Sequence, residues 1–113
     1  MAEKSKELGN IRINTEGSDY VPMFTVRPDG GIVAMKIVNT TENNQEKSDA
    51  YCYLYDLSYQ QVAEADIRKD VNLQDDYFYA GRILCDKDNR LYIQADEYIY
   101  LYDENLQYQE RWI

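Results

Sequence analysis

Histidine is absent from this chain of 113 residues, which contains only two cysteines, five glycines and two prolines. Without histidine the chain can form neither a Ser-His-Asp nor a Cys-His nucleophile system, and it lacks the most common metal ligand. The two cysteines, Cys52 and Cys85, are too far apart for a CxxC redox motif or a zinc knuckle, so we expect free buried thiols. These absences predict a chain that is not an enzyme and that binds no metal or cofactor.

Basic residues and long apolar runs are also scarce. The chain has 12 Lys and Arg against 21 Asp and Glu, a net charge of -9, so nucleic acid and anionic membrane surfaces are disfavoured as partners. No apolar run approaches the roughly 20 residues of a membrane helix, and residues 1–10 are charged and polar. We expect a soluble chain that does not insert into a membrane. Its compartment stays open, although a piece of a secreted protein would be extracytoplasmic.

An internal repeat is the strongest positive signal in the sequence. Tyr53–Asp56 reads Tyr-Leu-Tyr-Asp and recurs 47 residues later as Tyr100–Asp103. Upstream, Phe24–Val33 aligns with Ile83–Tyr92 at an offset of 59 residues. The difference between the two offsets falls in residues 39–50, a polar stretch that suits the solvated tip of a hairpin in the first copy.

Each copy divides into four short strands, because turn residues such as Asp29-Gly30-Gly31 and Asp88-Asn89-Arg90 separate apolar or alternating stretches. The sequence therefore predicts an all-β fold of two four-stranded antiparallel meanders, either open or completed by association. The expected strands are 23–27, 32–38, 51–56 and 61–67 in the first copy, and 82–86, 90–95, 98–103 and 107–113 in the second.

The same punctuation divides the chain into four parts. Residues 1–20 form a charged leader, and residues 21–67 form the first repeat with its polar insertion at 39–50. Residues 68–80 are polar and cross to the second repeat, which covers residues 81–113. We expect the leader to fold back over one sheet face, or the chain to self-associate, because the outer faces of two stacked sheets need cover.

A four-stranded unit repeated at this spacing resembles a blade of the NHL-like and related bacterial six- to eight-bladed β-propellers. The resemblance covers about residues 23–113. It implies a binding or scaffolding module of a larger bacterial protein, with a protein or a carbohydrate as its partner. Known propellers close with about four or more blades, whereas this chain has two. It is therefore a piece completed by further blades, a self-associating chain or an open pair of sheets. The alternative function is part of a propeller-fold carbohydrate-active enzyme whose catalytic residues lie elsewhere.

Two short motifs carry little weight. Residues 86–97 place carboxylates as a calcium loop would, but Leu91 stands where an EF-hand needs glycine, and the flanks are strands. Asn39-Thr40-Thr41 fits the glycosylation pattern, which is common by chance. We expect neither a calcium site nor a glycan.

Tyrosine is abundant, with 12 copies, and it alternates with aliphatic residues along the third strand of each repeat. Each of these strands thus has an aromatic face and an aliphatic face. Packing against a neighbouring sheet is the simpler interpretation, while an uncovered row would bind sugars by ring stacking or proteins by burial. The candidate binding or association surface consists of Tyr51, Tyr53, Tyr55, Tyr98, Tyr100 and Tyr102.

Overall fold

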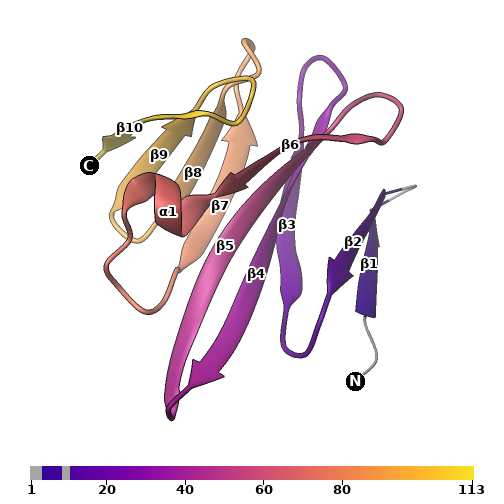
Figure 1. Cartoon of the computed structure of the whole chain (residues 1–113). Coiled ribbons are helices and arrows are strands. Elements are labelled where there is room, and N and C mark those ends of the chain that lie inside the picture. Colours follow the sequence, from indigo (N-terminus) through magenta and orange to yellow (C-terminus); the bar gives the residue numbers. More distant parts are fainter. Residues whose placement is uncertain (1–3, 9–10) are drawn as a thin grey trace.

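The prediction of an all-β fold is confirmed by the computed structural model, which describes residues 4–8 and 11–113 and contains three antiparallel sheets (Figure 1). A hairpin joins β1 (Lys4–Leu8) and β2 (Ile11–Thr15). The first sheet is the meander β3 (Tyr20–Val26), β4 (Ile32–Glu42), β5 (Gln45–Tyr55) and β6 (Gln61–Asp66). The second sheet is the meander β7 (Ala80–Cys85), β8 (Leu91–Ala95), β9 (Tyr98–Tyr102) and β10 (Tyr108–Trp112).

The polar insertion at residues 39–50 lies mostly within strands instead of forming a loop. β4 and β5 stay paired from Ile32 and Tyr55 out to Glu42 and Gln45. Asn43 and Asn44 form the two-residue turn, and both have positive φ, 53° and 63°. Asparagine tolerates this conformation, and a turn of this kind matches the twist of the flanking strands. The first repeat is therefore lengthened by a protruding hairpin arm.

Four hairpin loops share one pattern of backbone hydrogen bonds. The amide of the first residue donates to the carbonyl four positions later, and its carbonyl accepts from the amide three positions later. In three of them an aspartate starts the loop, and its Oδ1 accepts from amides two and four residues later. A positive φ at the fourth position closes each loop, as in a type I turn followed by a bulge. The first and fourth residues are Arg27 and Gly30, Asp56 and Tyr59, Asp86 and Asn89, and Asp103 and Leu106.

Asp86 shows the electrostatic consequence of this loop. Partial desolvation acts upward on its pKa, but the Tyr92 hydroxyl donates to Oδ2 at 2.8 Å and the Arg90 and Asp88 amides donate to Oδ1. Together with the Arg90 guanidinium, these donors lower the pKa of Asp86 to about 2. The carboxylate is thus a fixed acceptor that holds the loop closed.

The crossing between the sheets contains a short helix, α1 (Ile67–Val71), which begins after Asp66 accepts a hydrogen bond from the Lys69 amide. Arg68 then ties this segment back to the first sheet. Its guanidinium pairs with Asp49 and donates to the Ser48 carbonyl at 3.0 Å. The segment expected as a polar linker, residues 68–80, therefore begins within a helix, is tied to β5 through Arg68 and ends at the first residue of β7.

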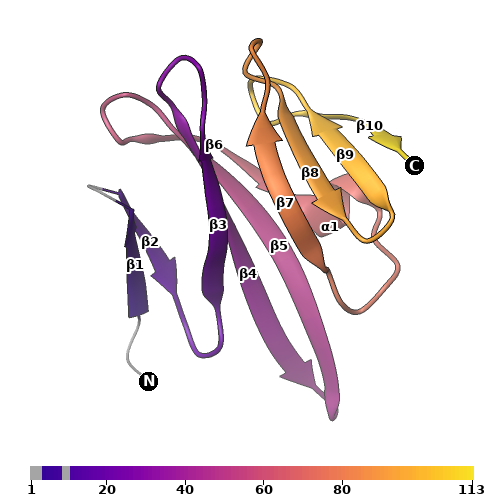
Figure 2. The same ribbon diagram turned by 180° about the vertical axis from the view of Figure 1, so that it is seen from behind.

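The core lies between the two four-stranded sheets, which lie side by side in both views (Figures 1 and 2). The first sheet contributes the aliphatic face of β4 and β5, and the second sheet contributes its tyrosine face. The largest fully buried side chains in this layer include Met35 and Val33 from the first sheet and Ile93 and Tyr102 from the second. Unlike faces of the two repeats thus pack against each other.

The β1–β2 hairpin lies on the opposite side of the first sheet from the second sheet (Figure 2). Ile11 and Ile13 of β2 are buried in a second hydrophobic cluster with Ala34, Tyr53 and Tyr55. The described part of the leader therefore folds back over the first sheet. Within residues 4–8 and 11–113, no helix has the length and apolar character needed to cross a membrane.

Candidate functional site

The two predicted tyrosine rows are placed against different neighbours. In the first sheet, Tyr53 and Tyr55 are buried beneath β2, with Tyr51 half-buried beside them. In the second sheet, Tyr100 and Tyr102 are buried between the sheets, with Tyr98 half-buried at their end. The structure therefore brings the side chains of each row together and packs each row against another part of the chain.

Polar contacts fit the tyrosine rows to their buried positions. Desolvation raises the pKa of Tyr102 far above its usual range, and its hydroxyl donates to Asp70 Oδ2 at 3.0 Å. The Arg111 guanidinium lies 4.4 Å from the Tyr98 ring centroid, a cation–π arrangement. Tyr102 is thus a buried hydrogen-bond donor, and the Tyr98 ring is packed against a cation.

One open apolar surface lies on the outward side of the second sheet. In the strand register, Leu84, Tyr92, Leu101 and Glu110 form one row, and Arg82, Gln94, Ile99 and Trp112 form the next. Residues paired across antiparallel strands share a face, and these rows alternate with the residues of the inter-sheet core. We call these eight residues the outer face, of which Leu101 is buried.

Large apolar side chains remain in contact with solvent on the outer face. Leu84 and Trp112 are 44% and 42% exposed. The Tyr92 and Trp112 ring centroids lie 5.7 Å apart, and a shallow pocket of about 410 Å³ is lined by Leu84, Tyr92 and Ile99 together with Arg82. An apolar surface with a polar rim is typical of an interaction site.

The repeat relates this outer face to an interface already formed within the molecule. Met35, Cys52 and Ala65 pair in register in the first sheet, on the face that packs against the second sheet. At the offsets of the two repeats, the equivalent residues are Gln94, Ile99 and Trp112. The neighbouring rows correspond in the same way. Thr25, Val33 and Leu54 are equivalent to Leu84, Tyr92 and Leu101, and Ala63 is equivalent to Glu110. The outer face is therefore the counterpart of a surface that accepts a tyrosine-bearing sheet.

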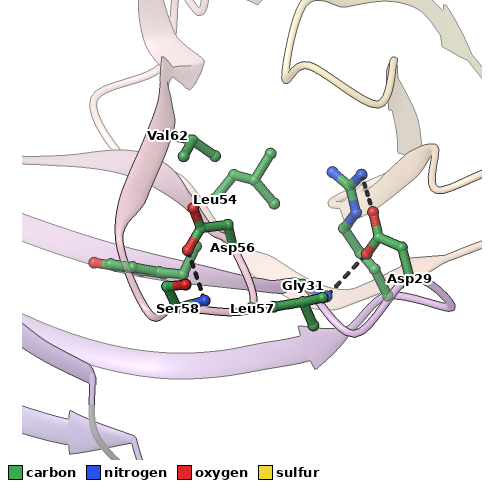
Figure 3. Close-up of a pocket in the computed structure, with 9 residues that line it drawn as sticks. Asp29, Gly31, Leu54, Asp56, Leu57, Ser58 and Val62 are labelled. Carbon is green, nitrogen blue, oxygen red and sulfur yellow. Dashed lines mark hydrogen bonds and ion pairs between the residues drawn. The ribbon is translucent and has the colours of Figure 1, made fainter.

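A second hollow, of about 350 Å³, lies between the β3–β4 and β5–β6 loops (Figure 3). Asp29, Gly31, Asp56 and Ser58 supply its polar wall, and Leu57 and Val62 lie on its apolar side. The Gly31 amide donates to Asp29 Oδ1 at 2.8 Å, and this bond, followed by the Arg27 side chain, lowers the pKa of Asp29. The carboxylates at the rim are engaged in turn formation.

Arg27 lines the same hollow and joins the two sheets. It is 8% exposed, and its Nη1 donates to the Glu104 carbonyl of the β9–β10 loop at 2.7 Å. Its Nη2 forms an ion pair with Asp29 at 2.8 Å. Arg27 occupies the position at which the second repeat has Asp86. Asp86 accepts hydrogen bonds within its own loop, whereas Arg27 donates to the distant β9–β10 loop.

The two cysteines are free, with Cys52 buried and Cys85 partly buried. Burial raises the pKa of the Cys52 thiol to about 12, and desolvation raises that of Cys85 to about 11. A protonated thiol is a poor nucleophile, so neither side chain is a reactive centre at neutral pH. In the described part of the chain, no three Cys, Asp or Glu side chains gather in a group that could hold a metal ion.

Sequence reasoning found the tyrosine rows but missed the outer face. The signal was present in the repeat alignment, which sets Ile99 and Trp112 against the core residues Cys52 and Ala65. That alignment becomes informative once the packing of the first sheet is known. Both faces of these strands carry apolar residues, so alternation alone does not show which face is covered.

Comparison with known protein families, curated proteins and solved structures gave no match. The architecture itself defines the class: an all-β chain with two four-stranded antiparallel sheets, which are blade-like in strand order and stack unlike faces together.

Proposed function

We propose that this chain is a non-enzymatic binding or scaffolding module, two blades of a propeller-like assembly in a larger protein, whose outer face accepts the tyrosine-bearing face of a further sheet. The observation that carries the proposal is the residue-by-residue correspondence between the outer face and the inter-sheet face of the first sheet. The resemblance of the sequence to NHL-like propeller blades supports the same function.

The chemistry of the outer face also favours binding. Met35, Val33 and Ala65 of the first sheet are replaced by Gln94, Tyr92 and Trp112. Trp, Tyr and Arg are the residues that contribute most strongly at protein interfaces, and Arg82 lies on this face as well. Polar and amphipathic side chains allow such a surface to be solvated in the unbound chain, and its aromatic rings are buried when the partner binds.

Radical footprinting tests the proposal by comparing the isolated 113-residue chain with the native protein purified from the cells that make it. We expect labelling of Leu84 and Trp112 to fall several-fold in the native protein, because a further sheet would cover them. Leu57 is the control, since it is 72% exposed and lies in the β5–β6 loop, away from the outer face. Equal labelling of Leu84 and Trp112 in both samples would contradict the proposed function.

A further inference from the structure

The β1–β2 hairpin occupies the place of a sheet. In the second sheet, Tyr100 and Tyr102 are covered by the aliphatic face of the first sheet. In the first sheet, the equivalent Tyr53 and Tyr55 are covered by Ile11 and other residues of β2. One tyrosine face therefore receives a four-stranded partner, and the other receives only a two-stranded one.

The hairpin covers that face incompletely. Phe24 and Val26 of β3 pair with Ala34 and Ile32, so they lie on the tyrosine face of the first sheet. They are 51% and 59% exposed. Their equivalents in the second sheet are Ile83 and Cys85. Ile83 is 8% exposed because the first sheet covers it, and Cys85 is partly buried. A wider partner than the hairpin would bury Phe24 and Val26 as well.

We propose that the outer face of a second copy of this chain packs on the tyrosine face of the first sheet, in competition with the β1–β2 hairpin. This inference rests on the proposed function and names the partner as another copy. The two surfaces are of the same kinds as those that already meet inside the molecule, so the contact continues an existing interface. Because unlike faces meet, the association is head-to-tail and extends into rings or filaments.

Charge is compatible with this contact, although the net charge of -9 on each copy opposes it at low salt. The outer face carries Arg82 and Glu110, and Asp86 lines its pocket. Desolvation is the largest cause of the raised pKa of Tyr51, and the neighbouring charges of Asp66, Asp49 and Glu64 raise it further. These carboxylates therefore lie beside the tyrosine face. Both surfaces carry charges of both signs, since Lys36 lies over the Tyr53 ring of the tyrosine face. Arg82 is the outer-face charge opposite in sign to these carboxylates, and salt screens the overall repulsion.

Sedimentation of the full chain at moderate salt tests the inference, with Ile13→Ala to loosen the hairpin and Ile99→Glu to block the outer face. Ile13 is 4% exposed, so its truncation should weaken the cover and tighten head-to-tail association at least about tenfold. Ile13→Ala combined with Ile99→Glu should be monomeric. Leu57→Glu combined with Ile13→Ala is the matched control and should associate like Ile13→Ala alone.

Three results would overturn the inference. They are a folded, monomeric Ile13→Ala variant, association that persists when Ile99→Glu is added, and association that Leu57→Glu abolishes equally. If Ile13→Ala fails to fold in circular dichroism, the wild-type chain concentrated to its solubility limit decides. Association lost in both Ile99→Glu and Phe24→Glu supports the inference, and a monomer throughout refutes it. Footprint protection in the native protein without association of copies would refute this inference alone and leave the proposed function standing.

Discussion

Replacing Arg27 by methionine tests whether a single side chain locks the two sheets together. Methionine keeps the apolar stem of the arginine and removes the guanidinium. The lost interactions are the bond from Nη1 to the Glu104 carbonyl at 2.7 Å and the ion pair with Asp29 at 2.8 Å. A hydrogen bond from a charged donor contributes about 1.5–3 kcal/mol, and an ion pair whose Asp29 partner is half-exposed adds at most about 1 kcal/mol.

One opposing contribution reduces this sum. Arg27 is 8% exposed, so its guanidinium was desolvated on folding, and that cost disappears with the substitution. We therefore expect the free energy of unfolding to fall by about 2 kcal/mol. Urea denaturation followed by far-ultraviolet circular dichroism measures the change as a shift in midpoint at constant slope.

Arg90→Met is the matched control, because Arg90 pairs with Asp86 in the equivalent loop but is 46% exposed. It should cost less than about 1 kcal/mol. A second readout is the carboxyl titration of Asp29 by NMR: its lowered pKa should move upward in Arg27→Met and stay put in Arg90→Met. The reasoning is refuted if Arg27→Met destabilises the protein no more than Arg90→Met does.

Three further predictions concern buried and titrating groups. Tyr102→Phe should lower the free energy of unfolding by about 1 kcal/mol in urea, because the hydroxyl of the buried Tyr102 side chain donates to the exposed Asp70 carboxylate. An unchanged midpoint would count against that bond. The folded-state pKa of Cys52 is raised to about 12, so the stability associated with this thiol is present below about pH 8.5 and declines as pH rises; Cys52→Ala should flatten this decline between about pH 8 and 9.5. The folded-state pKa of Asp86 is lowered to about 2, so its contribution is present above about pH 4 and is lost as pH falls toward 2; Asp86→Asn should be less stable at neutral pH and should lose less on acidification. Identical acid profiles for the wild type and Asp86→Asn would contradict this prediction.

The candidate site was only partly predictable. The tyrosine rows could be read from alternation, because a period of two places every second side chain on one face. The role of each row could not, since both faces of these strands are apolar and alternation does not say which neighbour covers which face. The link from Arg27 to Glu104 was also hidden, because it joins loops 77 residues apart in the sequence and interrupts the repeat pattern of loop aspartates.

The sequence by itself determined the repeat, the order of the eight strands in its two copies and the tight loops that join them, but neither the β1–β2 pairing nor α1. Loop residues such as Asp56 and Asp103 act locally, through bonds to amides two and four positions away, so their structure does not depend on distant parts of the chain. Only the tertiary structure decided that the aliphatic face of the first sheet meets the tyrosine face of the second, that β2 covers Tyr53 and Tyr55, and that the outer face is left open. These contacts bury apolar area between segments that are far apart in the sequence. Because the hydrophobic effect is non-directional, a local sequence pattern does not specify which apolar faces meet.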